Sequence, residues 1–349
     1  MDFSLFYFAN DSIQLGKGGR YELLLEGARF ADGNDFTAVW TPERHFHPFG
    51  GLYPNPAIAG AAVAAATERI AIRAGSVVAA LHHPLRIAED WAVVDNLSAG
   101  RVGISFASGW HPVDFALRPD AYAERRQIFV DTVDTVRRLW RGEPLAVVDG
   151  KGVRTEVRTF PPPIQRELPF WITTAGNTAT FELAGRQGAG LLTHLLGQEP
   201  DELAVKIRAY REAHQQMHGG DGHVVLMLHT FLGEHDRIKE VVRDPLCAYL
   251  KSSFSLISTT IARGGVTFDP ATIQESDVDY LAARGFERFY ETGGLFGPVD
   301  RALGLVHRLA DLGVDEIGCL VDFGVETKAV LDSLDALSEL RRQAAGVSR

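Results

Sequence analysis

Short apolar runs alternate with longer helical patterns along almost the whole chain of 349 residues. This alternation is typical of parallel βα units, in which each strand is followed by a helix that covers the sheet. Eight strands in strict alternation favour a closed barrel over an open doubly wound sheet, so we predict an α/β protein with a (β/α)8 TIM barrel. The expected strands cover residues 3–8, 36–40, 70–78, 102–106, 170–173, 191–193, 224–231 and 316–321.

The chain is longer than a bare barrel, which needs roughly 250 residues. We therefore expect one barrel domain over residues 1–349 with two insertions, at about 142–168 and 252–295. The first contains a hairpin-like patch, and the second begins with a Ser/Thr-rich turn at 252–260 and is where a lid would lie. A Gly-rich loop is expected at 16–19, and the principal helices at about 21–31, 56–66, 84–97, 122–140, 177–187, 199–214, 299–312 and 326–343.

Composition excludes several classes of partner. A net charge of −10 argues against nucleic acid, which requires a basic face. No apolar run approaches the 18 or more residues of a membrane span, and the first ten residues lack the basic region of a signal peptide. Cys247 and Cys319 are the two cysteines, which implies no disulfide framework and favours a reducing, cytoplasmic location.

A dense polar cluster follows the second predicted strand. Thr41, Glu43, Arg44, His45 and His47 arrive within seven residues of the end of that apolar run. Barrel enzymes carry their chemistry at the carboxyl ends of their strands, and this cluster supplies proton donors, proton acceptors and a fixed positive charge. An ordinary solvated loop after a strand remains the alternative for any single residue of the cluster.

The order of residues in this stretch is more informative than its polarity alone. Glu-X-His-Phe at 43–46, followed by Gly and then Asn-Pro at 55–56, resembles the bacterial luciferase-like family of flavin-dependent monooxygenases. In that family the segment forms the second barrel strand and one wall of the flavin site. Where the family often has Glu-His-His-Phe, this chain has Arg44 in place of the first histidine and keeps His45. As a hypothesis, we assign to Arg44 and His45 the stabilisation or protonation of the departing peroxide, with His194 and His229 as second candidates.

A small, hydroxyl-rich turn at 173–180 precedes a predicted helix. From spacing alone, Asn177 is either an ordinary N-cap or part of a phosphate site at the helix N-terminus. The resemblance implies that this turn holds the phosphate of flavin mononucleotide. It places the cofactor-binding positions of this turn at Ala175, Gly176, Asn177 and Thr180.

Other positions of the flavin site also follow from the resemblance. Arg126, with Arg125 close behind, matches a phosphate-binding arginine, whereas Ser108 stands where another arginine is common. Gly75 and Ser76 match the place where the family backbone, often through a non-proline cis peptide, contacts the flavin ring. A simple strand bulge is the alternative for Gly75. Ala107 and Ser108 belong to the expected floor of the same pocket.

Two further histidines stand at predicted strand ends. His194 follows the sixth strand and His229 lies in the seventh, so both are candidate catalytic residues as well as candidates for ordinary core or loop positions. His82 and His83 are adjacent and followed by Pro84, which suits a turn better than a metal site. We predict no metal.

The resemblance implies a monooxygenase that uses reduced FMN and inserts one oxygen atom from dioxygen. No nicotinamide-binding glycine motif follows the first strand, so a separate flavin reductase is expected. The segments at 294–300 and 313–324 resemble the group associated with polyketide and nonribosomal peptide pathways, including the mupirocin type. That resemblance implies a natural-product substrate, either free or tethered to a carrier protein, and a homodimer. The alternatives are a deazaflavin-dependent hydride-transfer enzyme, a non-catalytic flavin-binding protein and, last, a metal-dependent hydrolase.

Overall fold

The computed structural model describes residues 1–8, 19–174, 176–196, 198–233, 237–261 and 275–345. For residues 254–261 and 275 it describes the backbone alone. Two predicted segments therefore lie partly outside the described residues. They are the Gly-rich loop at 16–19 and the part of the expected lid at 262–274.

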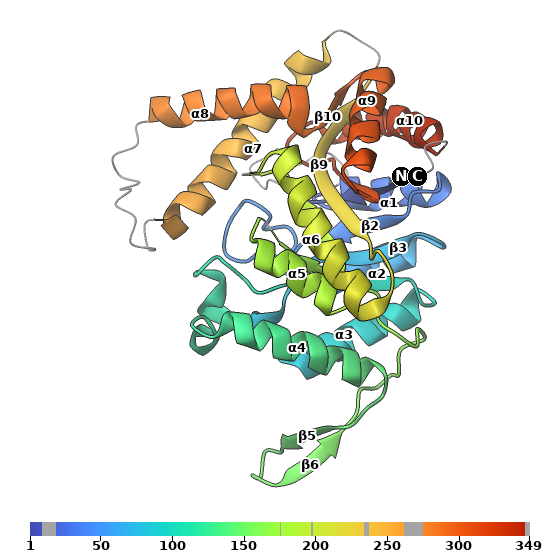
Figure 1. Cartoon of the computed structure of the whole chain (residues 1–349), viewed down its shortest axis with the longest axis vertical. Helices are drawn as coiled ribbons and strands as arrows, with labels where there is room; N and C mark the ends of the chain where they lie inside the picture. The colour runs from blue at the N-terminus through green and yellow to red at the C-terminus, as the bar shows by residue number, and fades with distance from the viewer. Residues whose placement is uncertain (9–18, 175, 197, 234–236, 262–274, 346–349) are drawn as a thin grey trace.

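Parallel strands form a closed barrel, as the alternation predicts (Figure 1). Neighbouring strands follow the chain order, β1 pairs with β11, and a pairing between β8 and β9 closes the ring. All of these pairings are parallel, which confirms the predicted (β/α)8 barrel. The ring consists of β1 (Asp2–Phe6), β2 (Ala38–Thr41), β3 (Ala71–Val78), β4 (Val102–Ala107), β7 (Phe170–Thr173), β8 (Gly190–His194), β9 (Val224–Leu232) and β11 (Glu316–Leu320).

Helices connect the strands and cover the outside of the barrel (Figure 1). Local sequence determines where α2 begins. Pro56 occupies its first turn. The Asn55 side chain accepts hydrogen bonds from the backbone N–H groups of Ala57 and Ile58. The covering helices are α1 (Glu22–Gly33), α2 (Pro56–Ala66), α3 (Pro84–Leu97), α4 (Arg125–Trp140), α5 (Thr178–Arg186), α6 (Pro200–His218), α9 (Val299–Asp311) and α10 (Thr327–Ala344).

The amino-terminal end of the barrel is filled by a buried ion pair. Arg73 donates to both carboxylate oxygens of Glu316, at 3.2 and 2.8 Å, and its guanidinium lies against the rings of Trp40 and Trp171. Trp40 also donates its indole N–H to Glu316. Because the charges and their hydrogen-bonding groups are satisfied together, a polar pair is accommodated at the centre of an otherwise apolar core.

The first predicted insertion contains an antiparallel hairpin that projects from the barrel, formed by β5 (Leu145–Val148) and β6 (Arg154–Val157) (Figure 1). After β9 the expected Ser/Thr-rich turn at 252–260 is wrong, because α7 (Ile238–Ile261) continues through it. Serine and threonine lower helix propensity only modestly, and the packing of α7 against α8 (Glu275–Arg288) outweighs that preference.

The segment after α8 returns to the barrel. A π-helical turn (Phe289–Gly293) leads to the short strand β10 (Leu295–Gly297), which pairs with the last residues of β9. In register, Leu295 lies opposite Thr230, directly after the last pairing of β9 with β11 at His229. The second insertion is therefore hydrogen-bonded to the barrel wall beside His229.

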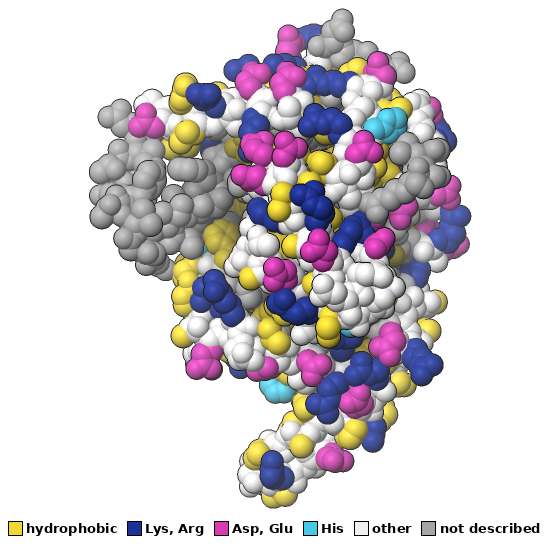
Figure 2. All heavy atoms as spheres, viewed as in Figure 1, with side chains coloured by type: hydrophobic (Ala, Val, Ile, Leu, Met, Phe, Trp, Pro, Cys, Tyr) yellow, Lys and Arg dark blue, Asp and Glu magenta, His cyan; other side chains and the backbone are white. Residues whose placement is uncertain are grey.

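The surface and the helices agree with the composition. On the face drawn in Figure 2, lysine and arginine side chains are interspersed with aspartates and glutamates. Among the described residues, none of the helices combines the length and the apolar character that crossing a bilayer would require.

Candidate active site

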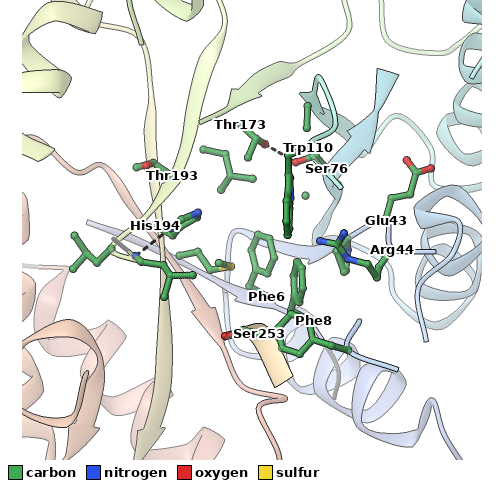
Figure 3. Close-up of a pocket in the computed structure, with 18 of the residues that line it drawn as sticks. Phe6, Phe8, Glu43, Arg44, Ser76, Trp110, Thr173, Thr193, His194 and Ser253 are labelled. Atoms are coloured by element: carbon green, nitrogen blue, oxygen red, sulfur yellow. Dashed lines mark hydrogen bonds between the residues drawn. The ribbon is translucent and has the colours of Figure 1, made fainter. Parts of the chain in front are cut away.

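A cavity of about 490 Å³ opens at the carboxyl ends of the barrel strands (Figure 3). This volume lies within the usual range for sites that hold a cofactor or a drug-sized ligand. Most of its wall is aromatic or aliphatic, whereas a few polar side chains converge on it from different strands. The apolar wall includes Phe6, Phe8, Val78, Trp110, Leu192, Leu195, Met227, Tyr249 and Phe289, and the polar residues include Glu43, Arg44, Ser76, Thr173, Thr193, His194 and His229.

Glu43 is a buried carboxylate that joins two histidines. Its Oε1 atom lies 2.8 Å from Nε2 of His45 and 2.5 Å from Nε2 of His82, while Oε2 accepts from the backbone N–H of Val78 at 2.7 Å. Burial works against the charged carboxylate, but the hydrogen bonds from the two histidines outweigh it and hold the pKa of Glu43 below its ordinary value. The same hydrogen bond raises the pKa of His82 against the opposing effect of burial. The protonated His82 imidazole and the Glu43 carboxylate thus stabilise one another, and Glu43 is the member of the pair that lines the cavity.

The same three side chains could hold a metal ion, because their ligand atoms lie within 4.8 Å of one another. Two histidines and a carboxylate are common zinc or iron ligands. The distances of 2.5 and 2.8 Å between the histidine nitrogens and Glu43, however, are those of direct hydrogen bonds. Ligands bound at about 2.1 Å to one tetrahedral ion lie more than 3 Å apart. The geometry therefore fits a hydrogen-bonded triad, and the absence of a metal remains a prediction.

Arg44 lines the cavity but is already paired. Its Nη1 donates to Asp114 at 3.0 Å, and the other oxygen of Asp114 lies 3.1 Å from Nδ1 of His111. The guanidinium also lies against the Trp110 ring, whereas its Nε has no hydrogen-bond partner among the described residues. The predicted partner of Arg44, His45, does not line the cavity and reaches it through Glu43. The structure thus places Arg44 at the wall and His45 behind it.

Gly75 and Ser76 lie at the cavity wall, as the resemblance implies. The peptide bond between them is cis, and the pairing of β3 with β4 shifts register here, so the bulge that the sequence left open is present. The Ser76 hydroxyl lies 2.5 Å from that of Thr173, which is 2.7 Å from Ser105. Ser76 and Thr173 therefore present hydroxyl groups to the cavity, and the buried Ser105 supports Thr173 from behind.

The turn before α5 has the predicted N-cap. Asn177 accepts from the backbone N–H of Ala179 at 3.0 Å, and Thr180 is half-buried one turn along. Gly176 lies close to Lys206, whose Nζ donates to Gln198 at 2.9 Å. Lys206 therefore brings a cation to the turn, although the sequence did not identify it as a site residue. Ala175 lies outside the described residues.

The two candidate arginines on α4 differ in position. Arg125 donates to the carbonyl oxygens of Gly109 and Tyr122, which ties the helix to the loop after β4. Arg126, which the sequence favoured, is exposed. Ala107 lines the cavity at the end of β4, and Ser108 follows it half-buried without lining it.

His194 and His229 both line the cavity, on adjacent strands. Their neighbours make both imidazoles uncharged at neutral pH: burial lowers the pKa of His194 to about 4 and that of His229 to about 3. Sequence reasoning selected both of these residues, but it missed Asp114 and named Glu43 and Thr173 only as parts of a polar cluster and a hydroxyl-rich turn. The only signal for Asp114 was its spacing of three residues from His111.

Comparison with known proteins places this chain in a family. A family model of luciferase-like monooxygenases matches residues 1–315. The oxygenase component of the flavin-dependent trigonelline monooxygenase of Acinetobacter baylyi is 25% identical over 257 residues, covering 70% of this chain and 69% of that protein.

Solved structures share the fold over nearly their whole length. Monooxygenase RslO1 from Streptomyces bottropensis has a TM-score of 0.80 at 23% identity, covering 99% of this chain and 100% of the other. The oxygenating constituent of 3,6-diketocamphane monooxygenase from Pseudomonas putida, in complex with FMN, has a TM-score of 0.74 at 16% identity, with 100% and 99% covered. An F420-dependent secondary alcohol dehydrogenase has a TM-score of 0.69 at 16% identity, with 97% of each chain covered. At these identities the likeness shows the fold alone.

Proposed function

Because the chain belongs to the luciferase-like monooxygenase family, we propose that it is an FMN-dependent monooxygenase that inserts one oxygen atom from dioxygen into an apolar organic substrate. The observation that carries this proposal is the cavity itself. It is lined by aromatic rings and bordered by the Gly75–Ser76 bulge, and Thr173 of its wall ends the strand that leads into the capped N-terminus of α5. An apolar cavity next to an anion-attracting helix end suits a planar ring with a phosphate tail.

The residues present fit a flavin. Ser76 and Thr173 offer hydroxyl groups to the polar edge of a ring, while Phe6 and Trp110 offer apolar faces. Asn177, Thr180 and Lys206 would hold the phosphate at the α5 turn. When bound, reduced flavin supplies the electrons that activate dioxygen.

The side chains around the cavity have separate tasks in this proposal. The aromatic wall excludes water, which strengthens every electrostatic interaction inside the cavity. Arg44 would provide a fixed positive charge at the cavity wall, and its pairing with Asp114 fixes the direction of the guanidinium. Glu43 lines the cavity and shares a proton with His82 behind it, with His45 as the second hydrogen-bond partner of Glu43.

Reduced flavin is proposed to come from a separate reductase. The name of the trigonelline relative, an oxygenase component, supports this arrangement. We further propose that the substrate is a natural-product intermediate, free or carrier-tethered, and that the protein acts as a homodimer. The segments at 294–300 and 313–324 support the natural-product assignment through their resemblance to that group.

The function can be tested by oxygen transfer. The protein, supplied with FMN and a generic flavin reductase, should consume dioxygen and add one ¹⁸O atom from ¹⁸O₂ to an accepted substrate, as read by mass spectrometry. A deazaflavin-dependent enzyme would instead transfer hydride without consuming dioxygen. Turnover with reduced deazaflavin and without label incorporation would refute the proposal.

The cofactor site can be tested without turnover. Lys206→Met should weaken FMN binding several-fold, because the ammonium group contributes charge at the phosphate. Riboflavin, which lacks the phosphate, should bind to the wild type and to Lys206→Met with equal affinity. Lys328→Met, an exposed lysine on α10, is the matched control. Equal loss of FMN and riboflavin affinity would exclude a phosphate role for Lys206.

A further inference from the structure

We propose that Arg288 is a positioning residue for the phosphate end of the cofactor site. It holds the connection between β8 and α6, and that connection orients the ammonium group of Lys206 at the α5 turn. This inference rests on the proposed function, because it concerns the phosphate of the same FMN. Arg288 is not among the described residues that line the cavity, so its effect passes through the residues that it contacts.

Arg288 ends α8 and reaches from the second insertion to the barrel. Its Nη2 donates to the carbonyl oxygens of Leu195 at 3.3 Å and Gln198 at 2.9 Å, and it lies 3.0 Å from the carboxylate of Glu199. Hydrogen bonds from a charged donor are roughly twice as strong as those between neutral groups. One guanidinium therefore anchors the β8–α6 connection, of which residues 195, 196, 198 and 199 are described, to the insertion.

The same connection contributes to the cavity. It leaves the barrel after His194, which ends β8 and is labelled in Figure 3. Leu195 lines the cavity, and Gln198 is buried, with 3% of its surface exposed. Backbone carbonyl groups beyond the end of a strand lose their partners in the sheet, so they need others. Arg288 is the partner of two such groups, and without it the connection would be held less firmly against the barrel.

Gln198 carries this anchoring to Lys206. Its side-chain amide donates to the carbonyl oxygen of His194 at 2.5 Å and lies 3.3 Å from the hydroxyl of Thr193. Its amide oxygen accepts from Nζ of Lys206 at 2.9 Å. Both ends of the amide group are thus engaged, which fixes its orientation. A lysine side chain that is already held in place loses less conformational entropy when a ligand binds.

The ammonium group of Lys206 lies beside the turn that precedes α5. A Cβ atom added at Gly176 would lie 3.5 Å from Nζ of Lys206 and 4.0 Å from the amide oxygen of Gln198. Asn177, the next residue, caps the helix, so the ammonium is close to the N-terminus of α5. A positive charge beside the free amides of a helix N-terminus favours an anion such as phosphate. Because Gln198 is neutral, it orients the ammonium without cancelling its charge.

The first test compares two flavins that differ by the phosphate. Arg288→Met and the wild type are titrated with oxidised FMN and with riboflavin, and binding is followed by flavin fluorescence. A less firmly held Lys206 should weaken FMN binding about three- to ten-fold, which is the worth of roughly one hydrogen bond. Riboflavin affinity should stay unchanged, which also shows that the variant is folded.

Two further variants accompany this test. Arg288→Lys, which retains a charged donor, should lose less FMN affinity than Arg288→Met. Arg284→Met is the matched control, because Arg284 lies one turn earlier on α8 and donates to Tyr280 of the same helix. Wild-type FMN affinity in Arg288→Met, or equal losses for FMN and riboflavin, would overturn the inference.

The second test asks whether the effect passes through Lys206. In a Lys206→Met background, Arg288→Met should weaken FMN binding by less than about two-fold, because the group that it positions is gone. Gln198→Leu should reproduce the selective loss of FMN affinity, since it removes the amide that holds the ammonium. Glu199→Gln should change FMN affinity little, because the carboxylate of that ion pair is exposed. Losses that simply add in the double variant would show that Arg288 acts independently of Lys206 and would refute the positioning role.

Failure of this inference is distinguishable from failure of the proposed function. Flavin affinities are measured without turnover, whereas oxygen insertion is measured by ¹⁸O incorporation. If oxygen is inserted but Arg288→Met binds FMN as the wild type does, the positioning role is wrong and the function stands. If the preference for FMN over riboflavin depends on Arg288 and Lys206 but no oxygen is inserted, the function is wrong and the positioning role stands.

Discussion

At the scale of single residues, two buried carboxylates of the barrel differ in how many hydrogen bonds they accept. Glu43 accepts three hydrogen bonds and is held in its charged form. Asp322, at the end of β11, accepts one from the backbone N–H of Phe8 at 2.6 Å, and its Oδ2 has no partner among the described residues. Hydrogen bonding therefore decides which buried carboxylate carries charge at neutral pH.

Glu43→Gln tests the charged carboxylate. Because the hydrogen bond and charge of Glu43 raise the pKa of His82, the substitution should lower the His82 pKa, which NMR titration of the imidazole resonances measures. Oxygen insertion should fall by ten-fold or more if this proton is used in catalysis. Glu89→Gln, at an exposed position on α3, is the control. An identical His82 titration in Glu43→Gln and the wild type would contradict the triad.

Asp322→Asn tests the second carboxylate. Burial raises its pKa to about 7, so the folded state binds a proton that the unfolded state releases near pH 4. Wild-type stability should therefore fall as pH rises from about 4 to 7. The asparagine variant lacks this cost, so it should be more stable than the wild type at pH 8, by at most about 4 kcal/mol.

The measurement is urea unfolding of Asp322→Asn and the wild type at pH 5 and pH 8. Asp311→Asn, at an exposed position on α9, should leave the pH dependence unchanged. A wild-type stability advantage over Asp322→Asn that grows with pH would show that the carboxylate is stabilised, not penalised, by its surroundings.

At the scale of elements, the site depends on how closely β3 approaches its neighbours. A side chain at Gly75 would place its Cβ 2.6 Å from Cζ of Phe6 and 3.2 Å from Cε3 of Trp40. Both rings are fully buried, so neither can move without disturbing the core. The glycine therefore leaves room for these two rings, of which Phe6 lines the cavity.

Gly75→Ala should destabilise the protein by about 1–3 kcal/mol, because one methyl group overpacks a closed core. Gly304→Ala is the matched control, since its Cβ would meet nothing within 4 Å on α9. That substitution should be neutral or slightly stabilising, as alanine is the better helix former. Thermal unfolding compares the two, and equal melting temperatures would contradict the predicted clash.

At the scale of the whole molecule, the ion pair that stabilises the barrel and the cavity that carries the candidate site lie at opposite ends of the strands. The ion pair of Arg73 and Glu316 fills the amino-terminal end, whereas the cavity lies at the carboxyl ends of the strands. Burial works against the charged form of Glu316, but Arg73 outweighs it and lowers the pKa of the carboxyl group. Removing one partner leaves the other as an unpaired buried charge.

Glu316→Gln should therefore cost about 3–5 kcal/mol of stability without changing FMN affinity in the folded protein. The double substitution Arg73→Met with Glu316→Leu should cost less, because no charge remains buried. Glu182→Gln breaks an exposed pair with Arg186 and should cost less than about 1 kcal/mol. Urea unfolding measures all three, and a Glu316→Gln loss no larger than that of Glu182→Gln would contradict this division.

Sequence patterns predicted the barrel because the hydrophobic periodicities of strands and helices can be recognised within short stretches of the chain. They could not predict that α7 continues through 252–260, since that depends on packing against α8. At the site, patterns selected Arg44 and His194, which follow strands directly. They gave no role to Asp114 or Thr173, whose positions depend on contacts between distant segments.

β9 changes its hydrogen-bonded neighbour from β11 to β10 along its length, and this limits how chimeras between relatives of this fold can be made. β9 leaves β11 after His229 and continues with β10, so the backbone of the second insertion is a structural part of the wall. A graft that exchanges only the helices α7 and α8 would keep this junction, provided that the recipient retains Leu295–Gly297. A graft that replaces everything up to the start of α9 with a segment lacking such a strand would leave backbone amides at the end of β9 without hydrogen-bond partners. We expect substrate preference to change in that chimera even if every cavity side chain is kept.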